Sequence, residues 1–504
     1  MQRREFIGGA AASAPFVRRL HGQSRRPNLV FIIADDHAGY VMGADGNRLA
    51  ETPNMDQLAR EGTRFAAHYC QSPVCTPSRQ CLLTGQLPHS AGVTTLRTAL
   101  SEEKPTLADK FQSAGYRTAT FGKMHFNQPG RPGLHGFQTA VTEDVLNQRW
   151  RAETKPKAIP PGVPGRGPWQ PFRVPAREWL NARAEPFARL DFDMKASYQT
   201  RLVREYLQAH QAEPFALWVS FHEPHSPFDF PVEDWKHFDP NRFPVPRLGP
   251  EDGWQIPLIY RDLSDTEKQG IISAYYGATR FLDRSVGTVL DLLREHGLEE
   301  NTLVVYTADH GYSLGQHGRF EKHCGYDPAM RVPLLMRWPG RIREGVVTEL
   351  TEHVDLSATL LDLMGLDPFA IQHGESLRPY LSSAASDSAR DWIFSELLEN
   401  EECYARSKKW KYIYCSGKRE RTDGYKIENP TPGRYQKLYD LEADPGEFTD
   451  VSAAQPEVVR DFQQKLLRRY RDTHPEAAAE PSAGSAADLL DYYVRPRDAA
   501  PVVA

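Results

Sequence analysis

Cysteine is scarce in this chain, with six residues among 504. So few cysteines in so long a chain do not form a disulfide-rich scaffold. Positive charge is not in excess either, because 61 Lys and Arg residues face 66 Asp and Glu residues, giving a formal net charge of −5 and a pI of about 6.4. This balance gives no indication of nucleic-acid binding. We find no internal repeat, and no apolar run after the N-terminus is long enough for stable insertion into a membrane.

The N-terminus has a pattern typical of export. Arg3 and Arg4 lead into Phe6-Ile7 and then into a mildly apolar, Ala-rich stretch that ends near Val17. This stretch is too short to span a bilayer and resembles a twin-arginine signal, although an ordinary basic tail is the alternative. We therefore expect residues 1–24 to be a signal peptide and the mature protein to be periplasmic or extracellular.

The segment 75–86, with the sequence Cys-Thr-Pro-Ser-Arg-Gln-Cys-Leu-Leu-Thr-Gly-Gln, organises the rest of the chain. Pro77 suits the first turn of a helix and Gly85 suits its end, so Cys75 is expected at the helix N-terminus. Exposed N–H groups and the helix dipole favour an anion there, and Arg79 projects toward the same end. Cys75 is therefore a candidate nucleophile.

Two less specific interpretations of Cys75 stay open from the residues alone. A single cysteine is commonly a buried structural thiol, and the nearby Cys70 and Cys81 suggest a disulfide or a metal cluster. The spacing Cys-x4-Cys-x5-Cys matches none of the common zinc templates, which disfavours the metal cluster.

Carboxylates follow two apolar runs that have the composition of buried parallel strands. Residues 28–34 lead into Asp35-Asp36, and residues 302–308 lead into Asp309-His310. Because ligands bind at the carboxyl ends of strands in open α/β sheets, these acidic groups are expected to converge. Three carboxylates in one crevice require a cation, and calcium suits a large, irregular set of oxygen ligands better than magnesium.

Further basic side chains follow other predicted strands. Lys123 and His125 lie two residues apart after the strand expected within residues 116–126, in a stretch predicted to be extended, so both side chains should face one way. His225 follows the strand predicted over residues 215–221 and lies between two prolines that restrict the backbone. His222 lies three residues earlier and is expected to contact the site residues rather than the ligand.

Cys75, Pro77 and Arg79, followed by Leu83-Thr84-Gly85, resemble the signature of the formylglycine-dependent sulfatases, the type I sulfatases of the alkaline phosphatase-like superfamily. In that family a Cys within Cys-x-Pro-x-Arg is oxidised after translation to Cα-formylglycine. The resemblance implies that Cys75 is converted by a formylglycine-generating enzyme, in the cytoplasm if the folded protein is then exported.

The same resemblance implies a role for each remaining site residue. Calcium would be held by the formylglycine at position 75 together with Asp35, Asp36, Asp309 and His310, although many members have Asn at the last position. The family's Gly-Lys-x-His and Pro-His-x-Pro motifs match Lys123, His125 and His225, and Lys322 matches a lysine that grips sulfate.

The implied reaction has two steps. One hydroxyl of the hydrated aldehyde attacks sulfur, and loss of the other hydroxyl's proton then releases sulfate. The oxygens of the sulfate would be stabilised by calcium, Arg79, Lys123 and Lys322, while His125 acts as the base and His225, with Lys322, protonates the leaving oxygen.

The resemblance extends over residues 28–451 and implies the fold. We expect an α/β architecture with a large, mostly parallel central sheet flanked by helices, and a smaller C-terminal α+β subdomain with an antiparallel sheet. The expected boundaries are 25–385 for the catalytic domain, 386–475 for the subdomain and 476–504 for a flexible tail. Short strands are predicted at 392–397, 402–406, 410–414 and 436–439. Pairing of Cys403 with Cys415 stays open, as does the oligomeric state.

Three functions are alternatives to hydrolysis of a sulfated carbohydrate. The fold could serve a phosphodiesterase or phosphonate monoester hydrolase, or a non-catalytic glycan-binding protein. Residues 122–126 and 134–137 resemble choline sulfatases, whereas the export signal and residues 314–318 resemble polysaccharide-directed members. We expect a sulfated carbohydrate as the substrate.

Overall fold

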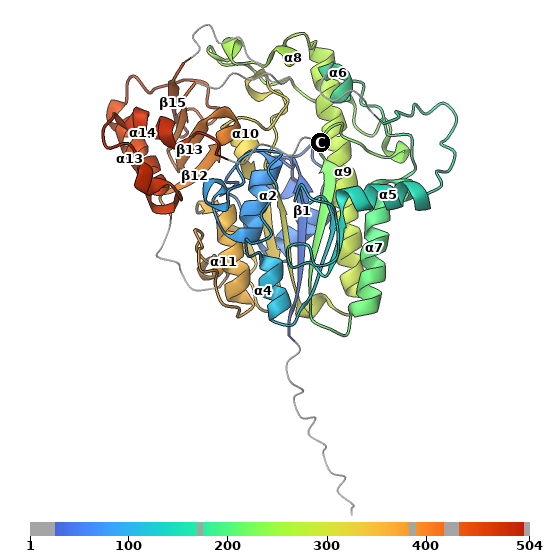
Figure 1. Ribbon diagram of the computed structural model, residues 1–504. Helices are drawn as coiled ribbons and strands as arrows, with labels where there is room; N and C mark the ends of the chain where they lie inside the picture. The colour runs from blue at the N-terminus through green and yellow to red at the C-terminus, as the bar shows by residue number, and fades with distance from the viewer. Residues whose placement is uncertain (1–25, 169–174, 383–389, 418–432, 498–504) are drawn as a thin grey trace, which may run out of the picture.

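The protein was analysed as a computed structural model, which describes residues 26–168, 175–382, 390–417 and 433–497. A large sheet lies at the centre, with helices α2, α4 and α11 on one face and α7 and α9 on the other (Figure 1). A smaller unit formed by the C-terminal part of the chain packs beside it. The predicted fold class is confirmed. The predicted signal peptide, residues 1–24, lies outside the described residues.

The central sheet has eight strands in the order β10-β2-β9-β7-β1-β6-β4-β5. Strands β7, β1, β6, β4 and β5 are mutually parallel, whereas β9 is antiparallel to its neighbours. The strands, in chain order, are β1 (Asn28–Asp35), β2 (Thr63–Phe65), β4 (Arg117–Gly122), β5 (Thr139–Thr142), β6 (Phe215–Pro224), β7 (Thr302–Ala308), β9 (Leu334–Arg337) and β10 (Gly345–Val347). A separate small sheet contains β3 (His68–Tyr69), β8 (Arg331–Val332) and β11 (Thr351–Glu352).

Strand β1 is buried on both faces, as its continuous apolar sequence predicts. Val30 and Ile32 pack into the core beneath α9, while Phe31 and Ile33 pack into the core beneath α2 and α11. Adjacent residues of a strand point to opposite faces, so a run without polar interruption must be covered on both sides. The polar residues therefore begin only where the strand ends.

The helices cover the two faces of the sheet and fill its connections. Those of the large unit are α1 (Pro53–Arg60), α2 (Cys75–Thr84), α3 (Pro88–Ala91), α4 (Leu107–Ser113), α5 (Glu143–Glu153), α6 (Ala176–Trp179), α7 (Lys195–His210), α8 (Leu258–Arg261), α9 (Asp265–Glu295), α10 (Asp327–Met330), α11 (His353–Leu363) and α12 (Arg378–Leu381). None of the helices within the described ranges is both long and apolar enough to cross a membrane.

The C-terminal unit is an antiparallel sheet covered by helices. Its strands follow the chain in order: β12 (Trp392–Leu397), β13 (Glu402–Ser407), β14 (Trp410–Cys415) and β15 (Tyr435–Asp440). The helices are α13 (Pro456–Thr473) and α14 (Ala486–Tyr493). The four strands predicted from the sequence are confirmed to within one residue at each end, whereas the boundary between the units falls in residues outside the described ranges and stays a prediction.

The structure revises one prediction for this unit and settles one open question. The segment predicted as a flexible tail contains α14, because Leu490 and Tyr493 are buried against α13, where Tyr493 stacks on Tyr470. The open disulfide is also settled by register. Cys403 lies opposite Tyr414 and Cys415 lies opposite Glu402, so the two thiols point to opposite faces of the sheet and both are free.

A buried charge cluster joins the two units. Lys411 of β14 is completely buried and its Nζ lies 2.8 Å from Asp327 Oδ1 and 2.9 Å from Glu447 Oε1. Burial alone would raise the pKa of Asp327, but Lys411 and Arg406 hold that pKa below its usual value. The large unit and the C-terminal sheet are therefore held together by Lys411, which contacts Asp327 at the start of α10 and Glu447 in the loop after β15.

Replacing Lys411 by Met should lower the free energy of unfolding by about 3 to 5 kcal/mol, because two carboxylates would be left without their buried partner. Denaturant unfolding of the purified protein measures this loss. Lys409→Met is the matched control, since the Lys409 side chain is 45% exposed and its nearest carboxylates are 3.7 Å away; its effect should stay within about 1 kcal/mol. Equal losses in the two variants would contradict this account of the junction.

Candidate functional site

Helix α2 begins at Cys75, as the positions of Pro77 and Gly85 predict. Val74 before it is extended, and Gly85 ends the helix with a φ of 68°. Every residue of the helix is buried, and Cys75 is only 1% exposed. The thiol therefore lies at the positive end of a helix dipole, inside the protein rather than at its surface.

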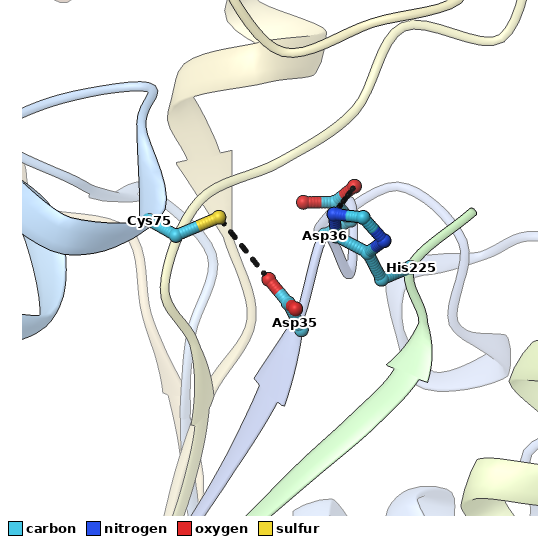
Figure 2. Close-up of side chains that lie close together, drawn as sticks. All are labelled: Asp35, Asp36, Cys75 and His225. Carbon is cyan, nitrogen blue, oxygen red and sulfur yellow. Dashed lines mark hydrogen bonds and ion pairs between the residues drawn. The ribbon is translucent and has the colours of Figure 1, made fainter. Parts of the chain in front are cut away.

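Three carboxylates meet the thiol at the carboxyl ends of β1 and β7. Ala34 pairs with Ala308, so Asp35 and Asp309 follow at the same level of the sheet. Cys75 Sγ lies 3.4 Å from Asp35 Oδ1, and the backbone N–H of Asp36 donates to Asp309 Oδ1 at 3.1 Å. Figure 2 shows Asp35 directed at the sulfur, with Asp36 and His225 on its other side. The convergence expected from the two strand ends is present.

Lys123 reaches this cluster through an unusual turn of the backbone after β4. Gly122 has a φ of 104°, and a Cβ atom there would lie 1.9 Å from the Ser220 carbonyl oxygen, so only glycine fits. Lys123 then contacts Asp35 Oδ2 through its ammonium group. His125 also has a positive φ, of 51°. The prediction of an extended stretch here is therefore wrong, and strand alternation does not set the direction of these two side chains.

Arg79 braces the centre of the site. Its Nε donates to Asp309 Oδ2 at 2.9 Å, and its Nη1 donates to the Lys123 carbonyl at 2.5 Å and to Ser220 Oγ at 2.8 Å. Nη2 lies 3.5 Å from Asp35 Oδ1, close enough for an ion pair but without a well-aligned hydrogen bond. The guanidinium group thus fixes the relative positions of three strand ends, with one N–H group directed at Asp35.

Lys322 and His310 complete the contacts around the thiol. Lys322 Nζ lies 2.8 Å from Asp36 Oδ1 and 3.1 Å from Cys75 Sγ. His310 Nε2 lies 3.1 Å from Cys75 Sγ and 3.4 Å from Asp36 Oδ1. Its other nitrogen is 3.0 Å from the Gly311 carbonyl oxygen, which only a protonated Nδ1 can satisfy. The lone pair of Nε2 therefore faces the cluster.

The two other predicted histidines differ in how closely they approach the site. His225 Nδ1 donates to the Ser226 carbonyl at 2.6 Å, which directs Nε2 toward Asp36 Oδ2 at 3.8 Å. His125 makes no side-chain contact with Cys75 or the three carboxylates among the described residues, and its buried Nδ1 lacks a partner there. Its backbone is held by Gln80, which donates to the His125 carbonyl at 2.9 Å.

Burial and mutual charge determine the protonation of the acidic groups. Burial raises the pKa of Asp36 to about 7 against the effect of Lys322, and burial raises that of Asp309 to about 6 against the effect of Arg79. Burial would also raise the pKa of Asp35, but Lys123, His225 and Arg79 hold it well below its usual value. Asp36 and Asp309 thus lack full compensation for their negative charge.

The pKa values of the three histidines and of Cys75 shift so that their neutral forms are favoured. Burial, then Lys123 or Lys322, keeps the pKa of His125, His225 and His310 well below the usual range, so these imidazoles are neutral. Burial followed by Asp35 raises the pKa of the Cys75 thiol well above its usual value. As a plain thiol, Cys75 is protonated at neutral pH and is a poor nucleophile.

The donor set fits a cation. Ligand atoms of Asp35, Cys75 and either Asp36 with His225 or Asp309 with His310 lie within 4.8 Å of one another. Asp36 and Asp309 have raised pKa values. The ammonium group of Lys123 contacts Asp35, and that of Lys322 contacts Asp36. Buried carboxylate oxygens that require more positive charge are suitable ligands for a hard divalent ion.

Two residues beside the site, Glu143 and Lys195, were missed from the sequence, although the neighbouring His222 was predicted. Glu143 Oε1 lies 2.8 Å from His222 Nδ1 and 3.2 Å from Lys195 Nζ, and the rings of His222 and His225 are 4.9 Å apart. Glu143 begins α5 directly after β5, just as Asp309 follows β7. The signal was the same strand-end rule, but residues 139–142 are too short and too polar to be recognised as a buried strand.

Most of the chain matches family models and known proteins. A family model described as Sulfatase matches residues 27–366, and one described as N-sulphoglucosamine sulphohydrolase, C-terminal, matches residues 315–473. The chain is 28% identical to a choline-sulfatase of Rhizobium meliloti, covering 89% of this chain and 86% of that protein. It is 25% identical to an N-acetylglucosamine-6-O-sulfatase of Bacteroides thetaiotaomicron, covering 90% and 88%.

A solved structure supports the fold independently. The phosphonate monoester hydrolase of Agrobacterium radiobacter aligns with a TM-score of 0.73 at 23% identity, covering 90% of this chain and 97% of that one. Similarity at this level of identity bears on the architecture and not on the reaction.

The burial of Cys75 predicts that native protein retaining this thiol resists alkylation. With iodoacetamide near neutral pH, the peptide containing Cys75 should stay unmodified, because the thiol is inaccessible and protonated. The same peptide should react fully after denaturation, which mass spectrometry of both digests would measure. Rapid labelling of Cys75 in the folded protein would contradict the buried position.

Proposed function

The chain belongs to the sulfatase family and is a sulfuric ester hydrolase, and we propose that its substrates are sulfated carbohydrates, cleaved with a formylglycine at position 75 and a calcium ion. One observation supports this proposal above all others. Asp35, Asp36 and Asp309, which come from strand ends far apart in the sequence, surround the side chain of Cys75. A fold alone would not require three acidic groups at one buried point.

Calcium would be held by Asp35, Asp36, Asp309 and His310, with Cys75 Sγ standing where an oxygen of the modified side chain would be. When bound, the ion supplies positive charge that polarises the sulfate group. In formal charge Arg79, Lys123 and Lys322 only equal the three carboxylates in number, so a divalent ion would give the site an excess of positive charge. This excess favours an anionic ester, and the irregular oxygen donors suit calcium better than magnesium.

Formylglycine would supply, as its hydrate, the oxygen nucleophile that the thiol of Cys75 cannot provide. The position supports this assignment, since the helix dipole of α2 and Lys322 stabilise negative charge at residue 75. Conversion by a formylglycine-generating enzyme is part of the proposal. The raised pKa of the unmodified thiol argues against direct attack by sulfur.

The remaining residues act on the sulfate group and on protons. Lys123 and Lys322 bind sulfate oxygens and compensate the charge that develops on them, while Arg79 holds Asp309 and the Lys123 backbone in place. His225 and Lys322 act together on the leaving oxygen: the Lys322 ammonium carries the proton, and the neutral His225 presents Nε2 to the cluster. His125 is the base that removes a proton from the modified residue.

A sulfated sugar is favoured over choline sulfate by the polar groups beside His225. Glu143, Lys195 and His222 offer hydrogen-bond donors and an acceptor to a polyol. The N-acetylglucosamine-6-O-sulfatase and the choline-sulfatase are about equally similar to this chain, so similarity does not decide between them. A phosphonate monoester hydrolase activity is the alternative reaction, since a phosphonate monoester hydrolase has the same fold.

Domain limits and export belong to the same proposal. We assign residues 25–385 to the catalytic domain and 386–475 to the C-terminal subdomain, with residues 1–24 removed as a twin-arginine signal. Export of a folded protein would allow Cys75 to be modified before the protein crosses the membrane.

Protein produced together with a formylglycine-generating enzyme should release sulfate from at least one sulfated mono- or oligosaccharide, as measured by ion chromatography. The peptide containing Cys75 should be lighter by about 18 Da, because conversion exchanges the thiol for an aldehyde. Cys75→Ala should abolish turnover. Preferential hydrolysis of phosphonate monoesters in a parallel assay, or an active protein with an unchanged Cys75 mass, would contradict the proposal.

Removing divalent ions should reduce turnover by at least about 100-fold, because Asp36 and Asp309 would lose their compensating charge and the sulfate group its strongest polarising partner. Dialysis against a chelator followed by addition of calcium or magnesium measures this effect. Calcium should restore activity more fully than magnesium. Full activity in the chelated protein, with no metal found by elemental analysis, would exclude the ion.

A further inference from the structure

Glu143 lies at the carboxyl edge of the sheet, next to the site already described. Gly122 of β4 pairs with Thr142 of β5 and also with Ser220 of β6. Lys123 and Glu143 therefore follow paired residues of neighbouring parallel strands, and His222 lies two residues beyond Ser220. The same edge that presents Lys123 to the sulfate group thus presents a carboxylate beside it.

We infer that Glu143 is a specificity-determining residue that accepts hydrogen bonds from hydroxyl groups of the sugar next to the sulfate ester. This assignment rests on the proposed function and adds to it the residue that distinguishes a polyol from other alcohols. The group has a suitable position, because His222 stands between Glu143 and His225, the residue that faces the leaving oxygen.

One oxygen of Glu143 is occupied and the other is available. Oε1 takes both protein contacts, with His222 Nδ1 at 2.8 Å and with Lys195 Nζ at 3.2 Å. Within residues 26–168, 175–382, 390–417 and 433–497 both polar contacts of Glu143 are made by Oε1 and none by Oε2, and the side chain is 23% exposed. The carboxylate is therefore oriented by two fixed groups while its second oxygen stays open to a ligand.

The charges around Glu143 favour hydroxyl groups over a cationic ligand. Lys195 is the first residue of α7, where a positive charge opposes the helix dipole, so this lysine is tolerated because Glu143 neutralises it. The Glu143–Lys195 pair carries no net charge, but the carboxylate is still a strong hydrogen-bond acceptor. A quaternary ammonium group has no hydrogen to donate and is bound chiefly by aromatic faces, so it gains little from this oxygen.

The alternative is that Glu143 only ties α5 to α7 and β6. A purely structural link would support the whole edge of the sheet, including Lys123 and His225, and its loss would weaken turnover of every substrate in the same proportion. A residue that reads sugar hydroxyls acts on polyol esters selectively. The ratio of kcat/KM values for a sugar ester and a simple aryl ester separates these two roles.

The experiment compares modified, calcium-loaded protein on a panel of hexose monosulfates, choline sulfate and 4-nitrophenyl sulfate. Glu143→Gln should lower the ratio of kcat/KM for the best hexose sulfate to that for the aryl sulfate by about 10- to 100-fold, the usual effect of losing a hydrogen bond to a charged group. Glu143→Asp, which keeps the charge but retracts it, should give an intermediate ratio and covers the case in which the Gln variant does not fold.

Asp144→Asn is the matched control, because Asp144 is the exposed neighbour of Glu143 in the first turn of α5 and the same charge is removed. Its ratio should equal that of the unaltered protein. Equal proportional losses on both esters in the Glu143 variants would overturn the assignment of Glu143 alone. Preferential wild-type turnover of choline sulfate would overturn the sulfated-sugar substrate of the proposed function together with this assignment. Failure of the wild type on every sulfate ester would instead overturn the proposed function and this assignment with it.

Discussion

The structure depends on one electrostatic constraint, the confinement of three carboxylates at a buried point. Asp35, Asp36 and Asp309 cannot share this space as free anions, because isolated buried charges are strongly unfavourable. The positive charges of Arg79, Lys123 and Lys322 contact these carboxylates, and each comes from a different segment of the chain. The parallel sheet brings the three carboxylates together. Helix α2 and the segments that carry Lys123 and Lys322 supply the opposing positive charge.

This constraint explains local features that otherwise look unrelated. Helix α2 begins at residue 75 and carries Arg79 one turn later, so a single element presents both the Cys75 side chain and the guanidinium that fixes Asp309. Gly122 permits the turn that directs Lys123 inward past Ser220. Both elements therefore place positive charge against the buried carboxylates.

Much of this arrangement could be predicted from the sequence, for identifiable reasons. Continuous apolar runs such as residues 28–34 and 302–308 have few alternatives to buried parallel strands, and Pro77 and Gly85 define the limits of α2. Backbone-dependent features were not accessible. The positive φ of His125 leaves no pattern in the side chains, and Glu143 follows a strand too short to recognise. Helix α14 is short, and its burial depends on packing against α13, which lies outside its own segment. The roles of individual residues came from family resemblance and not from spacing.

The central claim is that the carboxylates converge in order to hold a cation against a modified residue 75. A crystal structure of the mature protein grown with calcium, including anomalous diffraction data, tests this claim most directly. The account predicts a calcium peak with oxygens of Asp35, Asp36 and Asp309 at about 2.3 to 2.6 Å, and with Lys123 and Lys322 turned away from them. Density showing Asp35 still paired with Lys123 and Asp36 still paired with Lys322 around a vacant centre, under saturating calcium, would contradict it.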